Sequence, residues 1–378
     1  MRFLFACLSV GLTLLCVVAA GHAAGSTPSN VFKDPLVTPA DVRGSATANL
    51  SGLPILALAK IDEGARERIV AAGLHGVILF SDDGGAHWRQ GIVPVQSDLV
   101  SLSFVSSKQG WAVGHEGVIL HTDDGGETWK KQFDGKVAQD TLVKSYKTRI
   151  ANGEKELQPF LNEVELNTKG GATWPFLSVY FESDQIGYAV GSFGMLVKTK
   201  DGGKTWQPWL EHIENKDFLN LNDIRKIGRN IYIAGEQGTV YRLDREHQRF
   251  IAISPSYKGS FFHIVGNERF LLAMGLNGAA FRSVDGGHGW EEVNTGVRTS
   301  LTSAALSVDG KVVVLTGESG QVLYSTDDAQ TFGTIHIDQP MLFADVVALH
   351  DNWLVLAGFQ GIERKKILPE QNLAGGNT

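Results

Sequence analysis

Seven short turns in this 378-residue chain carry residue types that can do chemistry. Each turn has the form Gly-x-x-Gly, and the candidate binding residues between the glycines are His75, His115, Glu116, Phe193, Glu236, Asn277, Glu318 and Phe359. Facing carboxylates such as Glu116, Glu236 and Glu318 could hydrolyse a glycoside. His75 and His115 could ligate a metal, but two histidines without further ligands make an incomplete site.

The rest of the sequence does not complete either chemistry. The arginines are scattered, and none stands in the Phe/Tyr-Arg-Ile-Pro motif expected of a sialidase. We therefore predict no catalytic residue, no metal and no cofactor. The alternative for the eight turn residues is that they are exposed and free to vary.

A second motif, Ser/Thr-x-Asp-x-Gly-x-x-Trp, follows most of these turns. Its copies are Ser81-Asp83-Gly85-Trp88, Thr122-Asp124-Gly126-Trp129, Thr199-Asp201-Gly203-Trp206, Ser283-Asp285-Gly287-Trp290 and the eroded Ser325-Asp327-Ala329-Phe332. It resembles the Asp-box, or BNR, repeat of sialidase-like propellers. We predict a structural role, in which the Asp accepts backbone N–H groups, the Gly takes the strained φ and the aromatic ring packs between blades.

The spacing of the turns predicts the fold. The first glycines lie at 73, 114, 191, 235, 275, 317 and 358, so all intervals but one are 40 to 44 residues. Apolar segments flank each turn, which gives four short strands, A to D, in each period. The predicted fold is an all-β, seven-bladed β-propeller with Asp-box turns and one insertion between strands D and A after blade two. The propeller spans residues 51–367, and the second Gly of each turn is expected to accept positive φ.

The exceptional interval contains the insertion, residues 134–172. Val137–Ile150 has a pattern compatible with an amphipathic helix, and Leu157–Leu166 could form a second helix despite Pro159. We predict a helical hairpin or an ordered flap. Thr168–Trp174 resembles a degraded Asp-box, so a partly β insertion stays open.

Connectivity places these features on two faces. The Asp-boxes are C–D turns and share one face with the A–B turns. The Gly-x-x-Gly turns are B–C turns and share the other face with the insertion. We predict a mixed acidic and aromatic docking surface around the channel mouth, roofed by the insertion.

The ends of the chain predict export and ring closure. Residues 1–23 have the basic start, apolar run and small-residue ending of a signal peptide, so a periplasmic or otherwise exported protein with no span after cleavage is expected. Both cysteines, Cys7 and Cys16, would leave with the signal. Residues 24–50 are predicted to close the last blade, with 31–37 as its outer strand, and 368–378 are a flexible tail.

The amino-acid composition narrows the class of partner. There are 34 Lys and Arg against 41 Asp and Glu, a net charge of −7, which argues against nucleic-acid binding. Length alone predicts two or three domains, whereas the repeat predicts one ring with 44 glycines mostly in turns.

The seven repeats, the signal and the boxes DDGGxxW and KDGGKTW together resemble the photosystem II stability/assembly-factor-like family of exported propellers. The resemblance implies a non-enzymatic assembly platform. Similar bacterial proteins are associated with RND (MMPL-type) transporters, so the first expectation is an accessory protein that binds such a transporter through the B–C face and the insertion. The alternatives are a glycoside hydrolase, a sugar-binding propeller and a photosystem II assembly factor.

Overall fold

A computed structural model describes residues 52–63, 66–169 and 174–367 of the chain. The predicted signal peptide, the closing segment 24–50 and the tail 368–378 lie outside the described residues. No helix within the described part of the chain is long and apolar enough to cross a membrane.

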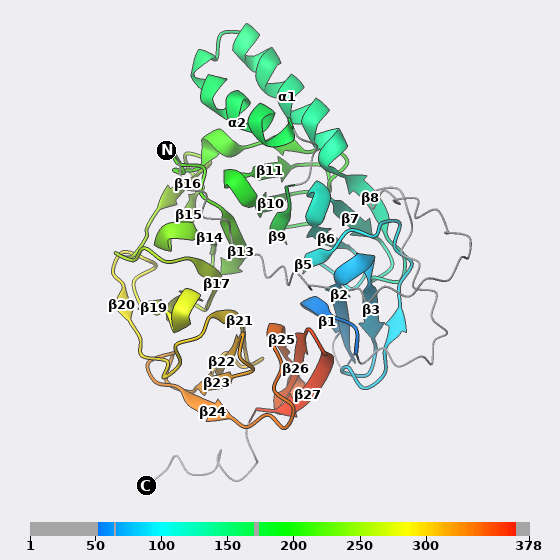
Figure 1. Ribbon diagram of the computed structural model, residues 1–378, viewed down its shortest axis with the longest axis vertical. Coiled ribbons are helices and arrows are strands. Elements are labelled where there is room, and N and C mark those ends of the chain that lie inside the picture. The colour runs from blue at the N-terminus through cyan, green and yellow to red at the C-terminus, as the bar shows by residue number, and fades with distance from the viewer. Residues whose placement is uncertain (1–51, 64–65, 170–173, 368–378) are drawn as a thin grey trace, which may run out of the picture. The chain divides into compact units, whose positions relative to one another are not determined.

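The described residues form seven antiparallel sheets around a common axis (Figure 1). Six sheets have four strands each, and the last has three within the described residues. The first three sheets contain β1 (Ile55–Glu63), β2 (Arg66–Gly73), β3 (Ile78–Ser81) and β4 (Arg89–Gln90); β5 (Leu99–Phe104), β6 (Gly110–Gly114), β7 (Ile119–Thr122) and β8 (Lys130–Phe133); and β9 (Phe176–Phe181), β10 (Gly187–Gly191), β11 (Leu196–Thr199) and β12 (Gln207–Pro208).

The remaining sheets repeat the same order from the axis outward. They contain β13 (Leu221–Ile227), β14 (Asn230–Gly235), β15 (Val240–Asp244) and β16 (Arg249–Ala252); β17 (Phe261–Gly266), β18 (Leu271–Gly275), β19 (Ala280–Ser283) and β20 (Glu291–Glu292); β21 (Leu301–Leu306), β22 (Val313–Gly317), β23 (Val322–Ser325) and β24 (Gly333–Ile335); and β25 (Phe343–Ala348), β26 (Trp353–Gly358) and β27 (Gly361–Lys366).

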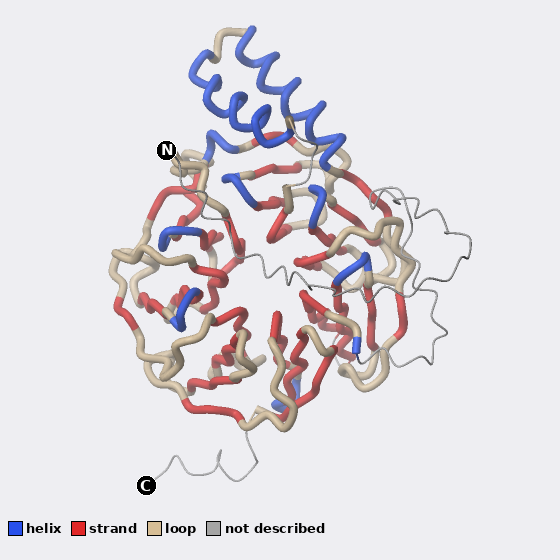
Figure 2. The backbone as a smooth tube through the Cα atoms, in the orientation of Figure 1, coloured by secondary structure: helices blue, strands red, loops and turns tan. Residues whose placement is uncertain are grey.

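The inner strands close the ring. Each inner strand contacts the inner strand of the next sheet, and β25 of the last sheet contacts β1 of the first. Figure 2 shows the strands as red segments converging on the axis, joined by tan loops. The apolar core lies between neighbouring sheets, for example where Trp111 stacks on Phe181 with ring centroids 3.4 Å apart. The predicted propeller is confirmed.

A ring of equivalent residues, which we call the inner belt, joins the sheets near the axis. In each inner strand, one residue interrupts the regular pairing with the second strand of the same sheet, and the residue after it resumes the pairing. The residues at this position are Ala57, Ser101, Ser178, Asp223, His263, Ser303 and Asp345. Several accept a backbone N–H from the next sheet: Ser101 from Val179 at 3.2 Å and Ser178 from Ile224 at 3.2 Å. The repeated polar position therefore joins neighbouring sheets by hydrogen bonds as well as by apolar packing.

The Gly-x-x-Gly turns lie where the sequence predicted, but their backbone differs in one respect. The residue before the second glycine is left-handed in five of them, with φ of 56° at His75, 54° at Glu116 and 58° at Phe193. The positive φ predicted for the second glycine is confirmed, for example at Gly76 with φ 70°. These five turns are single 3-10 turns in which two successive residues adopt the left-handed region.

The insertion is a helical hairpin. Helix α1 (Gly135–Ala151) is capped by Asp134, whose carboxylate accepts the N–H groups of Lys136 and Val137, and α2 (Gln158–Thr168) has Pro159 in its first turn. Proline is tolerated there because the first helical N–H groups have no partner within the helix. The partly β alternative fails for the described part, since Thr168 ends α2; residues 170–173 lie outside the described residues.

Candidate functional site

We call the surface formed by the seven Gly-x-x-Gly turns, the connections between sheets and the hairpin the turn face. The same backbone hydrogen bond fixes every turn. The residue after the first glycine donates its N–H to the carbonyl of the residue that precedes the inner strand of the same sheet. His115 N donates to Asp98 O at 2.9 Å, Glu236 N to Asn220 O at 3.0 Å and Phe359 N to Leu342 O at 3.2 Å. This backbone bond holds every turn, whichever side chains the turn carries.

The carboxylates predicted on this face are used by the fold. Glu236 Oε2 accepts the backbone N–H of Asn220 at 2.9 Å, and Glu318 Oε1 accepts that of Ser300 at 3.0 Å. Glu116 is half-buried, and its Oε2 has no hydrogen-bond partner among the described residues. Two of the three carboxylates cap their own connections and do not point toward a shared substrate, which disfavours the glycosidase alternative.

The two histidines share one carboxylate. His75 Nδ1 lies 3.9 Å from Asp98 Oδ1, and His115 Nδ1 lies 3.7 Å from Asp98 Oδ2. Asp98 also accepts the backbone N–H of His75 at 2.8 Å. Within the part of the chain that the structure describes, no three histidine, cysteine or acidic residues are grouped to hold a metal ion.

The hairpin is anchored through α1. Tyr146 is fully buried, and its hydroxyl donates to Glu211 Oε2 at 2.7 Å, in the connection after β12. Arg149 forms ion pairs with the same Glu211 and with Glu154, the latter at 2.7 Å. Burial and the neighbouring carboxylate together raise the pKa of Tyr146 well above its usual value, so the phenol stays protonated and donates.

The position of the hairpin corrects one prediction. Leu142, Leu161 and Val164 pack into the same core as Trp174 and the third sheet. The helices extend outward from the ring beside β11 (Figure 1), and α1 contacts β12, so they lie at the edge of the turn face and do not roof its centre. The cause is this core, which holds the inner sides of both helices against the rim.

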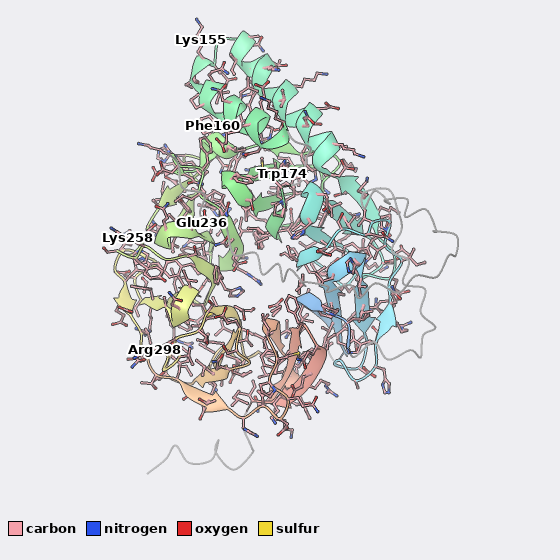
Figure 3. The ribbon with its side chains drawn as sticks, in the orientation of Figure 1. Lys155, Phe160, Trp174, Glu236, Lys258 and Arg298 are labelled. Atoms are coloured by element: carbon pink, nitrogen blue, oxygen red, sulfur yellow. The ribbon has the colours of Figure 1, made fainter. Side chains whose placement is uncertain are left out.

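Two phenylalanines, Phe160 and Phe218, meet where the hairpin joins the ring, and a third, Phe193, stands in the turn beside Phe218; we call the three the aromatic patch. Phe193 is 47% exposed in its turn, while Phe160 of α2 and Phe218 of the connection are half-buried. Phe160 and Phe218 are edge-to-face at 5.9 Å, and a β-carbon on Gly194 would lie 3.0 Å from the Phe218 Cα. Figure 3 places Phe160 and Trp174 at the base of the hairpin.

The other predicted turn residues are dispersed. Asn277 is exposed at φ 58°, and its side chain makes no hydrogen bond among the described residues. Phe359 is half-buried in the last turn. The structure therefore places the turn of Phe193 beside Phe218, and it brings His75 together with His115, but it does not assemble the eight residues into one site.

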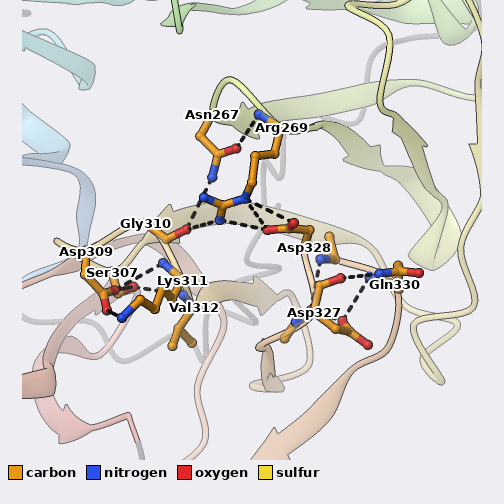
Figure 4. A network of polar contacts seen from close by, with 12 residues as sticks. Asn267, Arg269, Ser307, Asp309, Gly310, Lys311, Val312, Asp327, Asp328 and Gln330 are labelled. Carbon is orange, nitrogen blue, oxygen red and sulfur yellow. Dashed lines mark hydrogen bonds and ion pairs between the residues drawn. The ribbon is translucent and has the colours of Figure 1, made fainter.

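The Asp-boxes lie on the opposite face, where their side chains form hydrogen bonds within their own turns. Asp124 Oδ1 accepts from Thr122 Oγ1 at 2.8 Å and from Thr128 N at 2.9 Å, and Trp129 Nε1 donates to Gly126 O at 3.0 Å. Neighbouring sheets add arginine contacts: Arg269 binds Asp328 with Nε at 2.9 Å and Nη2 at 2.8 Å (Figure 4).

The pKa values of the box carboxylates follow from these bonds. Burial alone would raise the pKa of Asp83, but hydrogen bonds from His87 and Ser81 lower it to about 2. The same balance, with Thr331 and Ser325 as donors, lowers the pKa of Asp327 to about 2. These groups are ionised, satisfied acceptors with no capacity for acid catalysis at neutral pH.

Sequence reasoning missed the charged group at the inner belt. Asp223 and His263 are buried, with 3.2 Å between Asp223 Oδ2 and His263 Nδ1, and Arg225 Nε lies 3.1 Å from Asp223 Oδ1. Burial, which outweighs the nearby Asp223, lowers the pKa of His263. The sequence did contain a signal for this group. A polar residue recurs at the inner-belt position in six of the seven repeats.

Comparisons with known proteins agree with the fold. The family model described as photosynthesis system II assembly factor YCF48 matches residues 58–151. Two curated relatives, both photosystem II assembly lipoproteins Ycf48, are 24% identical over 42% of this chain in Synechococcus sp. (strain CC9902) and 30% identical over 40% of it in Nostoc sp. (strain PCC 7120 / SAG 25.82 / UTEX 2576). The alignments span 49% and 44% of those relatives, about half their length.

Solved structures extend the likeness to most of the chain. YCF48 bound to a D1 peptide aligns with a TM-score of 0.61 at 17% identity, covering 84% of this chain and 95% of that one. A GH74 xyloglucanase from Xanthomonas campestris gives 0.60 at 10% identity, covering 84% and 52%. At such identities the structures establish the fold alone. Together the comparisons identify a β-propeller like the photosystem II assembly factors, and the expectation of a non-enzymatic protein agrees with the assembly-factor names of the curated relatives.

Proposed function

We propose that this protein is a non-enzymatic, exported platform that holds a segment of a membrane protein complex on its turn face, as an assembly factor does. The observation that carries the proposal is the aromatic patch, where an exposed phenylalanine stands in a turn beside Phe218, whose ring contacts Phe160 of the hairpin. Aromatic residues at the centre of a contact supply much of the binding energy in protein interfaces.

The comparisons favour this role over the one that the sequence put first. The curated relatives are named as photosystem II assembly lipoproteins, and one structural relative is described with a D1 peptide bound. The matched relatives reported above include no RND-type transporter protein. A membrane-protein segment is therefore the proposed ligand class, and export through the 1–23 signal is part of the proposal.

In this proposal the anchored hairpin organises the patch, and the patch contacts the partner. Tyr146, Arg149 and Glu211 fix the hairpin, so the patch is organised before a partner arrives and little conformational entropy is lost on binding. Phe193 is the residue most available for contact, because almost half of its surface is exposed.

Affinity purification from the membrane fraction of the source organism tests the proposal. The tagged protein is compared with Phe193→Ala, with a form lacking residues 136–170, and with the control Asp123→Ala on the opposite face, whose side chain is exposed. We expect a membrane protein complex to be recovered by the wild type and the control, and at least tenfold less by the other two.

The identity of the recovered protein separates the alternatives. An assembling membrane complex supports the proposal, whereas an RND-type transporter would restore the accessory role. Equal recovery by all four forms would show that neither the patch nor the hairpin contacts the partner. Folding of each variant is checked by its melting temperature.

A further inference from the structure

A pocket on the turn face lies on the rim of the fifth sheet, where no role has been assigned. It has a volume of about 500 Å³, within the range of about 300–1,000 Å³ of small-molecule sites. Its floor is the turn Leu276–Gly278, and its walls are the connections on either side of the sheet, including Tyr257 and Asn294. The aromatic patch does not contribute to it.

The floor is rigid. Gly278 has φ 76°, and a β-carbon there would lie 2.2 Å from the Val297 carbonyl oxygen, so the turn and the wall are in direct contact. Thr295 Oγ1 donates to Gly278 O at 3.1 Å, which ties the same wall to the floor. The pocket is therefore part of the fold and does not depend on a mobile side chain for its shape.

One wall is an aromatic ring held in a fixed orientation. The Tyr257 hydroxyl donates to Leu276 O at 3.1 Å, and its ring packs against Phe261 and Phe281, both with centroids 5.1 Å away. Half-buried in this way, Tyr257 offers part of its ring to the pocket.

Two polar side chains of the lining have no partner among the described residues, and a third is only partly used. The Asn277 amide and the Glu292 carboxylate make no hydrogen bond or ion pair among the described residues, although both side chains are exposed at the pocket. Asn294 uses its oxygen to accept Gly296 N at 2.9 Å, which leaves its amide N–H groups as donors. The pocket thus holds free donors and free acceptors beside one aromatic ring.

We infer that this pocket binds a saccharide. A sugar hydroxyl both donates and accepts, which matches an amide and a carboxylate side by side, and the apolar face of a sugar ring packs on an aromatic side chain. The flanking cations Lys258 and Arg298 are exposed and form no ion pair within the described residues (Figure 3). They extend the same chemistry to saccharides that carry carboxylates. This site is separate from the proposed protein contact.

Isothermal titration with two probes, chitohexaose and hexagalacturonate, tests the inference on the full exported chain. We expect at least one probe to bind, and we expect Asn277→Ala and Glu292→Gln each to weaken its affinity at least tenfold. Glu291→Gln is the matched control, because Glu291 is the next residue but pairs with Arg282 at 2.7 Å. The control should stay within twofold of the wild type.

Three results would overturn the saccharide site. Absence of binding by both probes, or affinities within twofold in both pocket variants, would overturn the saccharide site. Loss of the protein partner in Asn277→Ala and Glu292→Gln would instead make the pocket part of the protein contact and also overturn it. Phe193→Ala should keep saccharide binding, so failure of the proposed function and failure of this site are distinguished.

Discussion

The carboxylate of Asp345 in the last sheet accepts the backbone N–H of Leu58 in the first sheet at 2.7 Å. The same side chain accepts the hydroxyl of Ser303 from the preceding sheet and the N–H of Val346 at 2.8 Å. A residue 287 positions away from Leu58 therefore joins the two ends of the ring through the inner belt.

Replacing Asp345 by Ala should destabilise the protein by about 2 kcal/mol or more, because buried donors lose their acceptor. Chemical unfolding with urea measures this. Asp338→Ala is the control, because the Asp338 carboxylate is exposed and solvent screens its ion pair with Lys365, so its loss should change stability little. Equal loss in the two variants would contradict a closing role for Asp345.

The Asp-boxes should contribute stability and no binding. Asp124→Ala removes the bonds to Thr122 and Thr128 and should cost about 1–3 kcal/mol. Asp123→Ala, the adjacent residue, pairs only with exposed Lys130 and should change stability by less than about 1 kcal/mol. Partner recovery by folded Asp124→Ala should equal that of the wild type; a specific loss of binding would assign the box a functional role.

Acid should destabilise the protein through the same carboxylates. Asp83 and Asp327 have folded pKa values of about 2, below the value of about 3.9 in an unfolded chain. Their contribution is present above about pH 4 and is lost as the pH falls toward 2, because the unfolded state then binds more protons. Melting temperatures of wild type and of Asp83→Asn/Asp327→Asn measure this, and the variant should show a shallower decline between pH 4 and 2.

The hairpin anchor should respond to loss of one hydroxyl. Tyr146→Phe removes the donor to Glu211 and leaves that carboxylate with Arg149, at an expected cost of about 1–2 kcal/mol. Limited proteolysis at the exposed Asn152-Gly153 loop should accelerate. Gln158→Ala on the exposed side of α2 is the control, and equal rates in the two variants would show that the hydroxyl does not hold the hairpin.

The closing segment stays a prediction, because residues 24–50 lie outside the described residues. The last sheet has three strands within the described part, while the other six have four. Deleting residues 24–45 should lower the melting temperature sharply if the segment supplies the outer strand. An unchanged melting curve would reject that closure.

The fold was predictable because its signals are local and repeated. A Gly pair such as Gly114/Gly117 and a box such as Thr122–Trp129 each specify a turn without reference to the rest of the chain. The helices could be placed for the same reason, and Pro159 fitted because it stands in the first turn of α2.

The contacts that depend on three dimensions could not be predicted. Glu236 reads as a free carboxylate in sequence, whereas it accepts the N–H of Asn220, a residue brought near by the antiparallel pairing. The contact of Phe160 with Phe218, beside the turn of Phe193, depends on the direction in which the hairpin extends from the ring. Periodicity along the chain gives the length of the helices but not their direction.

The backbone bonds that tie each Gly-x-x-Gly turn have an evolutionary consequence. The tie from Leu276 N to Ser260 O, and its counterparts in the other turns, uses no side-chain atom, so it does not specify which residue donates it. Folding constrains the turns in two other ways, through the left-handed φ of the second residue in five of them and through the caps formed by Glu236 and Glu318. First positions without a capping side chain, such as Ser192 and Phe359, can therefore mutate while the ring stays intact. The face is a scaffold on which these positions can be randomised to select binders to new targets, with Glu236, Glu318 and the left-handed positions left unchanged.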